Sequence, residues 1–153
     1  MQPATPADLL RGVALADMGF GARIRLPMVM VDRHVPYPAD VVWTLLTDLD
    51  AWPRWGPSIS GAVLDSGGRY LVAGSTGTVT AIGAVSVPFA VTEFEPGRRW
   101  AWSVAGVPAT AHGVEAAPGG CRVWFEVPWW AAPYTAVCAI ALRRIDSLAA
   151  TRR

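Results

Sequence analysis

The feature that most constrains the fold of this chain is its middle part, from Ile59 to Val127, which is predicted to be a continuous run of β-strands. Glycine-containing turns separate these strands, at Gly67-Gly68, Gly74, Gly83, Pro96-Gly97, Gly106 and Gly119-Gly120. Glycine and proline at such positions end one strand and allow the chain to reverse. Successive strands with no helix between them favour an antiparallel sheet over the alternating strand and helix order of parallel sheets.

Helices are predicted on both sides of this run. A first strand over Arg25–Val35 is followed by Pro38, which favours the start of a helix, and apolar residues at helical spacing come after it. A second short helix is predicted over Leu49–Trp55, and a long last helix from Ala131 onwards. The apolar face of the last helix consists of Tyr134, Cys138, Ala141, Ile145 and Leu148. This order predicts an α+β fold: a curved antiparallel sheet of about six or seven strands wrapped around a long C-terminal helix, with two short helices after the first strand.

The first 22 residues are predicted to form a helix appended to this domain. Thr5 has the hydroxyl of a helix N-cap, Pro6 favours the first helical position, and Asp8 suits the first turn. Gly19 ends the helix. The expected organisation is therefore a helical extension over residues 1–22 and a single domain over residues 23–153.

Composition excludes several classes of function. The net charge is +1 and no basic stripe is present, so we expect no nucleic acid partner. The chain contains no lysine, which excludes Schiff-base catalysis. Two cysteines without CxxC spacing and two histidines do not form a metal-binding pattern, and no nucleotide-binding fingerprint occurs. We therefore expect neither a metal nor a cofactor.

The charge-free stretch Val127–Leu142 is the segment most similar to a membrane span. It is shorter than the ~20 residues needed to cross a bilayer, and Pro128 and Pro133 interrupt it. The N-terminus lacks the basic start and apolar run of a signal peptide. We therefore expect a cytoplasmic protein whose last helix is buried. The sequence leaves the oligomeric state open, and a homodimer is one option.

The residues around the first predicted helix carry a resemblance to a known family. They read Pro38-Ala39-Asp40-Val41-Val42-Trp43, then Leu46-Thr47-Asp48, then Trp52-Pro53-Arg54-Trp55. This pattern is similar to the opening of the START-like (SRPBCC) superfamily of polyketide cyclases, dehydrases and lipid carriers. The resemblance covers roughly residues 25–150, and it implies the helix-grip fold with space for a ligand under the long helix.

Charged residues predict which face of the sheet is buried, because an unpaired charge in the interior is costly. Pairing Arg99 with Glu115, and Glu115 with Arg122, places an opposite-charge ladder on the outer face. The loop between the first two of these strands is then Gly106-Val107-Pro108. Because side chains alternate along a strand, their neighbours face inward. The inward set is Trp100, Trp102, Val104, Thr110, His112, Val114, Val123, Phe125 and Val127.

This inward set predicts a ligand pocket, since it is mostly apolar with two polar positions, Thr110 and His112. The candidate ligand-binding residues are Phe89, Val91, Trp100, Trp102, Thr110, His112, Phe125, Tyr134 and Ala141. A filled core that contains one hydrogen-bonded histidine fits the same pattern.

Glu93 is predicted on one face or the other according to the turn at Pro96-Gly97. A two-residue turn places Glu93 inward beside Trp100, where burial would raise the pKa of its carboxyl group. A three-residue turn places it on the outer face, next to Arg99.

Three functions fit these observations. The first is the binding of a small apolar molecule, such as a lipid, an isoprenoid or a polyketide. The second is a cofactor-free polyketide cyclase or dehydratase, in which His112, with or without Glu93, is the general acid and base. There, Thr110 and Tyr134 would hold a carbonyl or enol oxygen. The third is a structural or interaction role with a filled core.

Overall fold

The computed structural model describes residues 27–81, 83 and 85–152, so the helix predicted over residues 1–22 lies outside the described part. The elements in chain order are β1 (Met28–Val35), α2 (Ala39–Thr47), α3 (Trp52–Trp55), β2 (Ile59–Leu64), β3 (Thr76–Ala81), β4 (Val85–Glu95), β5 (Arg99–Val104), β6 (Val107–Ala117), β7 (Gly120–Pro128), the 3₁₀ helix η1 (Trp129–Tyr134) and α4 (Thr135–Ala149). This order confirms the predicted α+β helix-grip architecture. The predicted last helix is divided, because residues 129–134 form the 3₁₀ helix and α4 follows it.

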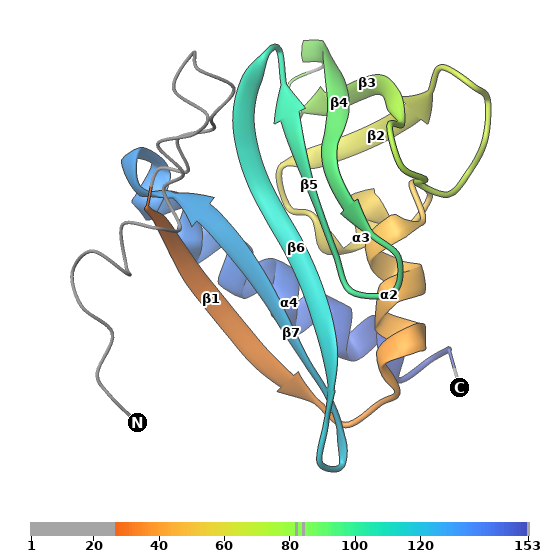
Figure 1. Cartoon of the computed structure of the whole chain (residues 1–153), viewed down its shortest axis with the longest axis vertical. Helices are drawn as coiled ribbons and strands as arrows, with labels where there is room; N and C mark the ends of the chain where they lie inside the picture. The colour runs from red at the N-terminus through yellow and green to blue at the C-terminus, as the bar shows by residue number, and fades with distance from the viewer. Residues whose placement is uncertain (1–26, 82, 84, 153) are drawn as a thin grey trace.

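The seven strands form one antiparallel sheet in the order β1-β7-β6-β5-β4-β3-β2. Figure 1 shows the sheet curving in front of α4, with α2 and α3 on the same side of the sheet as α4. The first and last strands of the described chain are therefore neighbours, β1 beside β7. The core lies between the concave face of the sheet and the three α-helices.

The predicted inward face of the sheet is correct, but one strand pairing is not. Glu115 pairs with Arg122 as predicted, whereas Arg99 lies opposite Gly113. The expected three-residue loop is in fact the two-residue turn Ala105-Gly106, in which both residues have positive φ (52° and 78°). The turn alone would shift the pairing by three residues, but a bulge between Ala101 and Ser103 takes one residue back, so the partner of Arg99 differs by two from the prediction. A shift of two leaves the side chains on their predicted faces.

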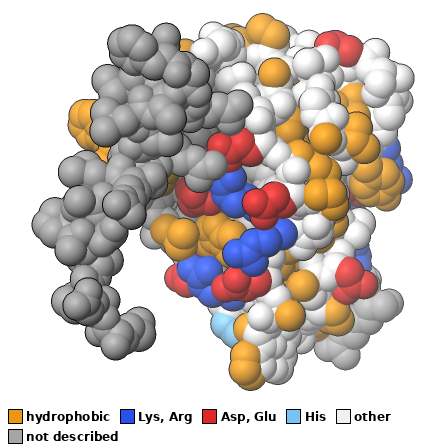
Figure 2. All heavy atoms as spheres, in the orientation of Figure 1, with side chains coloured by type: hydrophobic (Ala, Val, Ile, Leu, Met, Phe, Trp, Pro, Cys, Tyr) orange, Lys and Arg blue, Asp and Glu red, His pale blue; other side chains and the backbone are white. Residues whose placement is uncertain are grey.

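The outer face of β1, β7 and β6 carries the expected charged residues, which alternate in sign in Figure 2. Arg122 Nε donates to Asp32 Oδ2 at 2.7 Å, and its Nη1 lies 3.4 Å from Glu115 Oε1. Trp124 is buried on this face, with the guanidinium groups of Arg98 and Arg122 5.6 and 5.1 Å from its ring. Gly113 makes room for this indole, because a Cβ at position 113 would lie 2.2 Å from it.

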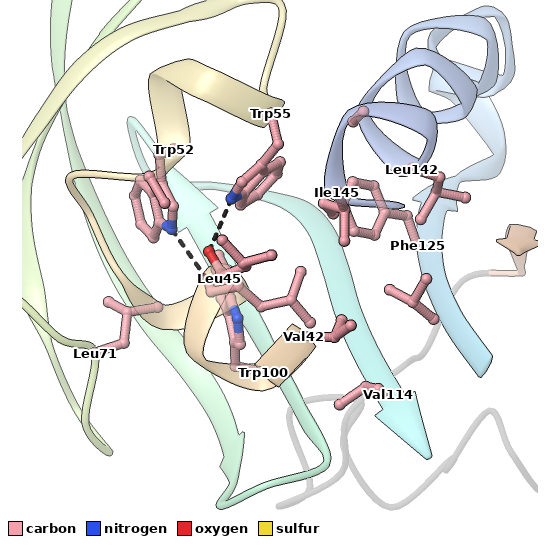
Figure 3. Packing of buried hydrophobic residues seen from close by; sticks show 14 of the residues in the cluster. Val42, Leu45, Trp52, Trp55, Leu71, Trp100, Val114, Phe125, Leu142 and Ile145 are labelled. Atoms are coloured by element: carbon pink, nitrogen blue, oxygen red, sulfur yellow. Dashed lines mark hydrogen bonds between the residues drawn. The ribbon is translucent and has the colours of Figure 1, made fainter. Parts of the chain in front are cut away.

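Two tryptophans of α3 fix this short helix to the end of α2. The last carbonyl groups of an α-helix have no partner within the helix. Trp52 Nε1 donates to the carbonyl oxygen of Leu46 at 3.0 Å, and Trp55 Nε1 donates to that of Leu45 at 2.8 Å (Figure 3). Both indoles are buried, so they act as packing residues and as a polar cap at once.

Asp48, at the end of α2, anchors two later parts of the chain. Its side chain is fully buried and accepts two hydrogen bonds of 2.9 Å from Arg69, and Arg152 lies 3.5 Å away. Burial favours a higher pKa for this carboxyl group, but the hydrogen bonds from Arg69 and from the backbone of Asp50 together hold the pKa below its ordinary value. The pairing of Asp48 with Arg69 holds the segment after β2 against the helix.

Candidate functional site: an apolar groove at one end of the sheet

The inner face of the sheet beneath α3 is filled by stacked aromatic side chains. Trp52 stacks on Trp100 with ring centroids 5.5 Å apart and an angle of 12° between the rings. Trp102 meets Trp52 edge-on at 5.4 Å, and the imidazole of His112 stacks on Trp100 at 4.0 Å. Phe125 completes this layer against His112 and Trp55. The positions predicted to form the deep pocket wall therefore pack mainly against one another.

Only a small space remains inside this aromatic layer. This inner cavity has a volume of about 30 Å³, and Trp100, His112, Phe125 and Ala141 are among the residues that line it. A cavity of that size holds about one water molecule. The inner cavity therefore has no room for an organic ligand as it stands.

A larger space lies beside it, between the ends of the strands and η1. This mouth groove has a volume of about 250 Å³ and is open to solvent. Trp102, Trp130 and Tyr134 form part of its wall, and the remaining wall is largely aliphatic: Ile59, Val79, Ala81, Val87, Val104, Ala109, Val127 and Ala131. A dry cavity of about 150 Å³ accommodates benzene, and pockets for drug-sized ligands start at about 300 Å³. The mouth groove thus has the size for a small organic molecule.

No charged side chain of the described residues lines either space. The strand ends that meet at the groove are rich in valine and alanine, and their nearest acid, Glu126, bonds Arg99 on the outer face. Two tryptophans lie beside the opening, with Trp129 55% and Trp130 52% exposed. The groove and its rim are therefore apolar.

Three hydroxyl groups are the polar features of the groove. Ser58 Oγ and Tyr134 Oη are 2.6 Å apart and share a hydrogen bond that joins the segment before β2 to η1. Thr110 Oγ1 accepts a hydrogen bond of 3.0 Å from Trp102 Nε1 and is 2.9 Å from His112 Nε2. Ser58, Thr110 and Tyr134 line both the inner cavity and the mouth groove, so these hydroxyls lie where the two spaces adjoin.

His112 is a neutral group in this environment. Burial lowers the pKa of its imidazole to about 3; the nearby backbone of Trp100 acts in the opposite direction, and the charge of Arg99 adds to the lowering. Nδ1 has no hydrogen-bond partner of good geometry among the described residues. A group with this pKa is a weak general base near neutral pH and has no proton to donate as imidazolium. The site therefore uses His112 as a hydrogen-bonding neighbour of Thr110.

Glu93 lies on the outer face, away from both spaces. The turn after β4 has three residues, and the Glu93 carboxylate is ion-paired with Arg99, which also bonds Glu126. A bulge between Val91 and Glu93 reverses the alternation at this point, so Val91 faces inward while Glu93 does not. Glu93 and His112, the two candidate catalytic residues, are thus on opposite sides of the sheet.

The other predicted ligand-binding residues fall into two groups. Trp102, Thr110 and Tyr134 border the mouth groove as well as the inner cavity. Trp100, His112, Phe125 and Ala141 border only the inner cavity, and Phe89 and Val91 border neither; Phe89 packs against Trp52 and Trp102. The groove residues that belong to neither the predicted inward set nor the predicted ligand-binding set are Ser58, Ile59, Val79, Ala81, Val87, Ala109, Pro128, Trp130 and Ala131. Most of them have small side chains: Val79, Ala81 and Val87 face the groove from β3 and β4, whereas β5, the next strand, carries Trp100 and Trp102.

Two further findings concern metal binding and membrane spans among the described residues. Residues 27–152, apart from the two omitted at positions 82 and 84, contain no group of three or more His, Cys, Asp or Glu side chains that could hold a metal ion. No described helix is both long and apolar enough to cross a membrane.

Comparisons with known proteins agree with this architecture. Residues 28–149 match the family model for polyketide cyclase/dehydrase and lipid transport proteins. No curated protein matches the sequence.

Solved structures share the fold at low sequence identity. A Mesorhizobium loti protein superposes with a TM-score of 0.64 at 13% identity, over 80% of this chain and 96% of that one. A Nitrosomonas europaea protein gives 0.61 at 17% identity, over 82% and 95%. An AHSA1-like protein from Aeromonas hydrophila gives 0.59 at 16% identity, over 80% and 94%. At these identities the structures support the fold alone, and it is the family match over most of the chain that identifies it: the protein belongs to the polyketide cyclase/dehydrase and lipid transport family of the START-like superfamily.

Proposed function

We propose that this protein binds a small apolar molecule in the mouth groove. The observation that carries the proposal is the groove itself: about 250 Å³, lined by uncharged and mainly aliphatic side chains, with a few hydroxyl groups at its inner end. Such a combination is typical of ligand sites, where apolar walls supply affinity and a few polar groups set orientation. The family description, which includes lipid transport, supports the same class of ligand.

The proposal does not require a chemical step. An enzyme of the cyclase or dehydratase type needs an acid or base poised near the pH of the reaction. The low pKa of His112 and the outward position of Glu93 supply no such group at the groove. Binding, followed by storage or delivery, is the function that the geometry favours.

A matched pair of valine variants tests the proposal. Val87→Phe fills the groove, whereas Val63→Phe adds the same atoms on a side chain of β2 that is 67% exposed and lines neither space. We expect isothermal titration calorimetry to show binding of 2-methoxynaphthalene to the unmodified protein and to Val63→Phe. For Val87→Phe we expect affinity to fall by at least about tenfold, the equivalent of 1.4 kcal/mol.

The same titrations can contradict the proposal. If Val87→Phe binds the probe as well as Val63→Phe does, or if the unmodified protein binds neither 2-methoxynaphthalene nor its hydroxyl analogue 2-naphthol, the groove is not the ligand site. Native mass spectrometry of the purified protein complements the titration, since a co-purified adduct would give the mass of a natural ligand.

A further inference from the structure

A short chain of hydrogen bonds connects the aromatic interior to the groove. It runs from Trp102 Nε1 to Thr110 Oγ1, and from Thr110 Oγ1 to His112 Nε2. Trp102 and Thr110 line the mouth groove, while His112 is buried behind them. The direction of these bonds determines what Thr110 can offer to a ligand.

The chemistry of each partner limits these directions. An indole N–H can only donate, so Thr110 Oγ1 accepts from Trp102. A neutral imidazole has one N–H and one lone pair, so His112 Nε2 either accepts the Thr110 hydroxyl proton or donates to Thr110 Oγ1. In either case the Thr110 hydroxyl keeps one free capacity, a lone pair in the first and its proton in the second.

The Ser58 and Tyr134 hydroxyls add further capacity at the inner end of the groove. Each has one proton, and their shared bond uses only one of the two, so this pair keeps a donor as well as free lone pairs. Together with Thr110, the pair offers both donors and acceptors, which matches a hydroxyl group, since a hydroxyl donates and accepts.

The walls of the groove restrict the charge of the ligand. A carboxylate or phosphate would lose its hydration and meet no cationic side chain of the described residues. An organic cation would meet no carboxylate of the described residues, and the groove wall is mainly aliphatic, with Trp102, Trp130 and Tyr134 as its aromatic members. Either kind of ion would therefore lose hydration without gaining an ion-pair partner.

Given the proposed function, we propose that the ligand is an uncharged alcohol or phenol. Its hydroxyl group forms hydrogen bonds with the hydroxyl groups of Thr110, Ser58 and Tyr134 at the inner end of the groove, and its apolar body lies along the valine and alanine side chains of the mouth groove. This assigns Thr110 as the residue that selects the ligand's functional group.

Three probes with one ring system test this at neutral pH on the full chain: 2-naphthol, 2-methoxynaphthalene and 2-naphthoate. We expect 2-naphthol to bind at least about tenfold more tightly than 2-methoxynaphthalene, because only 2-naphthol has a hydroxyl proton to donate. One additional hydrogen bond with a buried partner contributes a free energy of this size. We expect 2-naphthoate to bind most weakly. Equal affinities for 2-naphthol and 2-methoxynaphthalene, or tightest binding of 2-naphthoate, would overturn the ligand class while leaving the groove as the binding site.

Substitutions at Thr110 separate selection from packing. Thr110→Val keeps the shape and removes the hydroxyl group, so the preference for 2-naphthol should disappear while 2-methoxynaphthalene still binds. Thr110→Ser should retain the preference. Thr80→Val is the matched control, because Thr80 bonds Ser86 on an exposed part of β3 and lines neither space. A preference that survives Thr110→Val would contradict the assignment, and failure of all three probes to bind the unmodified protein would instead contradict the proposed function.

Discussion

The inner face of the sheet has two regions of opposite character. Beneath α3, tryptophans, phenylalanines and one histidine stack until only about 30 Å³ is left empty. At the ends of the strands, valines and alanines leave about 250 Å³ open. Both regions are apolar, and both belong to the same sheet.

The difference teaches that apolar character alone does not predict a pocket. Interiors pack as densely as organic crystals, so large rings that can reach one another will close the space between them. Trp52, brought over the sheet by α3, supplies the ring that covers Trp100 and Trp102. Near η1 the strand residues that face the groove are mainly valines and alanines, and a groove remains.

A pair of tryptophan truncations gives the largest expected contrast between the two regions. Trp52→Ala removes a fully buried ring and its hydrogen bond to Leu46, so we expect the free energy of unfolding to fall by about 3–5 kcal/mol. Trp130→Ala removes a half-exposed ring at the groove, and we expect a loss of less than about 1 kcal/mol. Urea denaturation monitored by circular dichroism measures both.

A loss of stability in Trp130→Ala that equals or exceeds the loss in Trp52→Ala would contradict the distinction between a filled and an open region. If Trp130→Ala costs as much as Trp52→Ala, then Trp130 is buried in solution and the groove is covered. Trp129→Ala serves as a control, because Trp129 is equally exposed but does not line the groove.

The aromatic region should also make the fold sensitive to acid. The pKa of His112 is lowered to about 3 in the folded protein, chiefly by burial, against about 6.5 when unfolded. Between these values the unfolded chain binds a proton that the folded chain does not, so stability falls as the pH falls, by up to about 1.4 kcal/mol per pH unit. The effect begins near pH 6.5 and is complete near pH 3.

The window from pH 6.5 to 4.5 isolates this effect, because the pKa of Asp48 is held below the ordinary range of carboxyl groups. Denaturation midpoints for His112→Gln should be nearly independent of pH in that window, while those of the unmodified protein decline. An equally steep decline in both proteins would mean that another group carries the proton, and that His112 is not buried as neutral imidazole.

Much of the fold could be predicted from the sequence, since its strongest signals are local. Turn glycines, Pro38 and the helical spacing after it identify the elements, and the charges of Arg99 and Arg122 identify the outer face. The partner of Arg99 could not be predicted, because the length of the turn at Ala105-Gly106 depends on a positive φ at Ala105. No residue pattern in the sequence indicates a positive φ at an alanine.

The site was predicted less well, for a physical reason. Trp100, His112 and Phe125 were correctly predicted to face inward, but whether an inward residue borders empty space depends on what packs against it from another element. That element is α3, whose Trp52 and Trp55 pack against the aromatic residues of the sheet. The groove residues carry no motif, and their small side chains are equally typical of a tight core.

Glu93 offers the smallest expected effect and the sharpest test of which face a residue occupies. Its position depended on two local irregularities, the three-residue turn at Pro96-Gly97-Arg98 and the bulge after Val91. Since the Glu93 carboxylate pairs with Arg99 at the surface, we expect Glu93→Gln to reduce stability by no more than about 1 kcal/mol. Affinity for 2-methoxynaphthalene should not change, because Glu93 lines neither space.

Glu126→Gln is the matched comparison on the same face. Glu126 accepts from Arg99 Nε at 2.7 Å and from Trp124 Nε1 at 3.1 Å, so its loss should destabilise the fold more than the loss of Glu93 does. Ligand binding should survive both changes. If Glu93→Gln alone abolishes binding, or any turnover of a bound ligand, the Glu93 carboxylate reaches the interior in solution and the outer face would have to be reassigned from this residue onward.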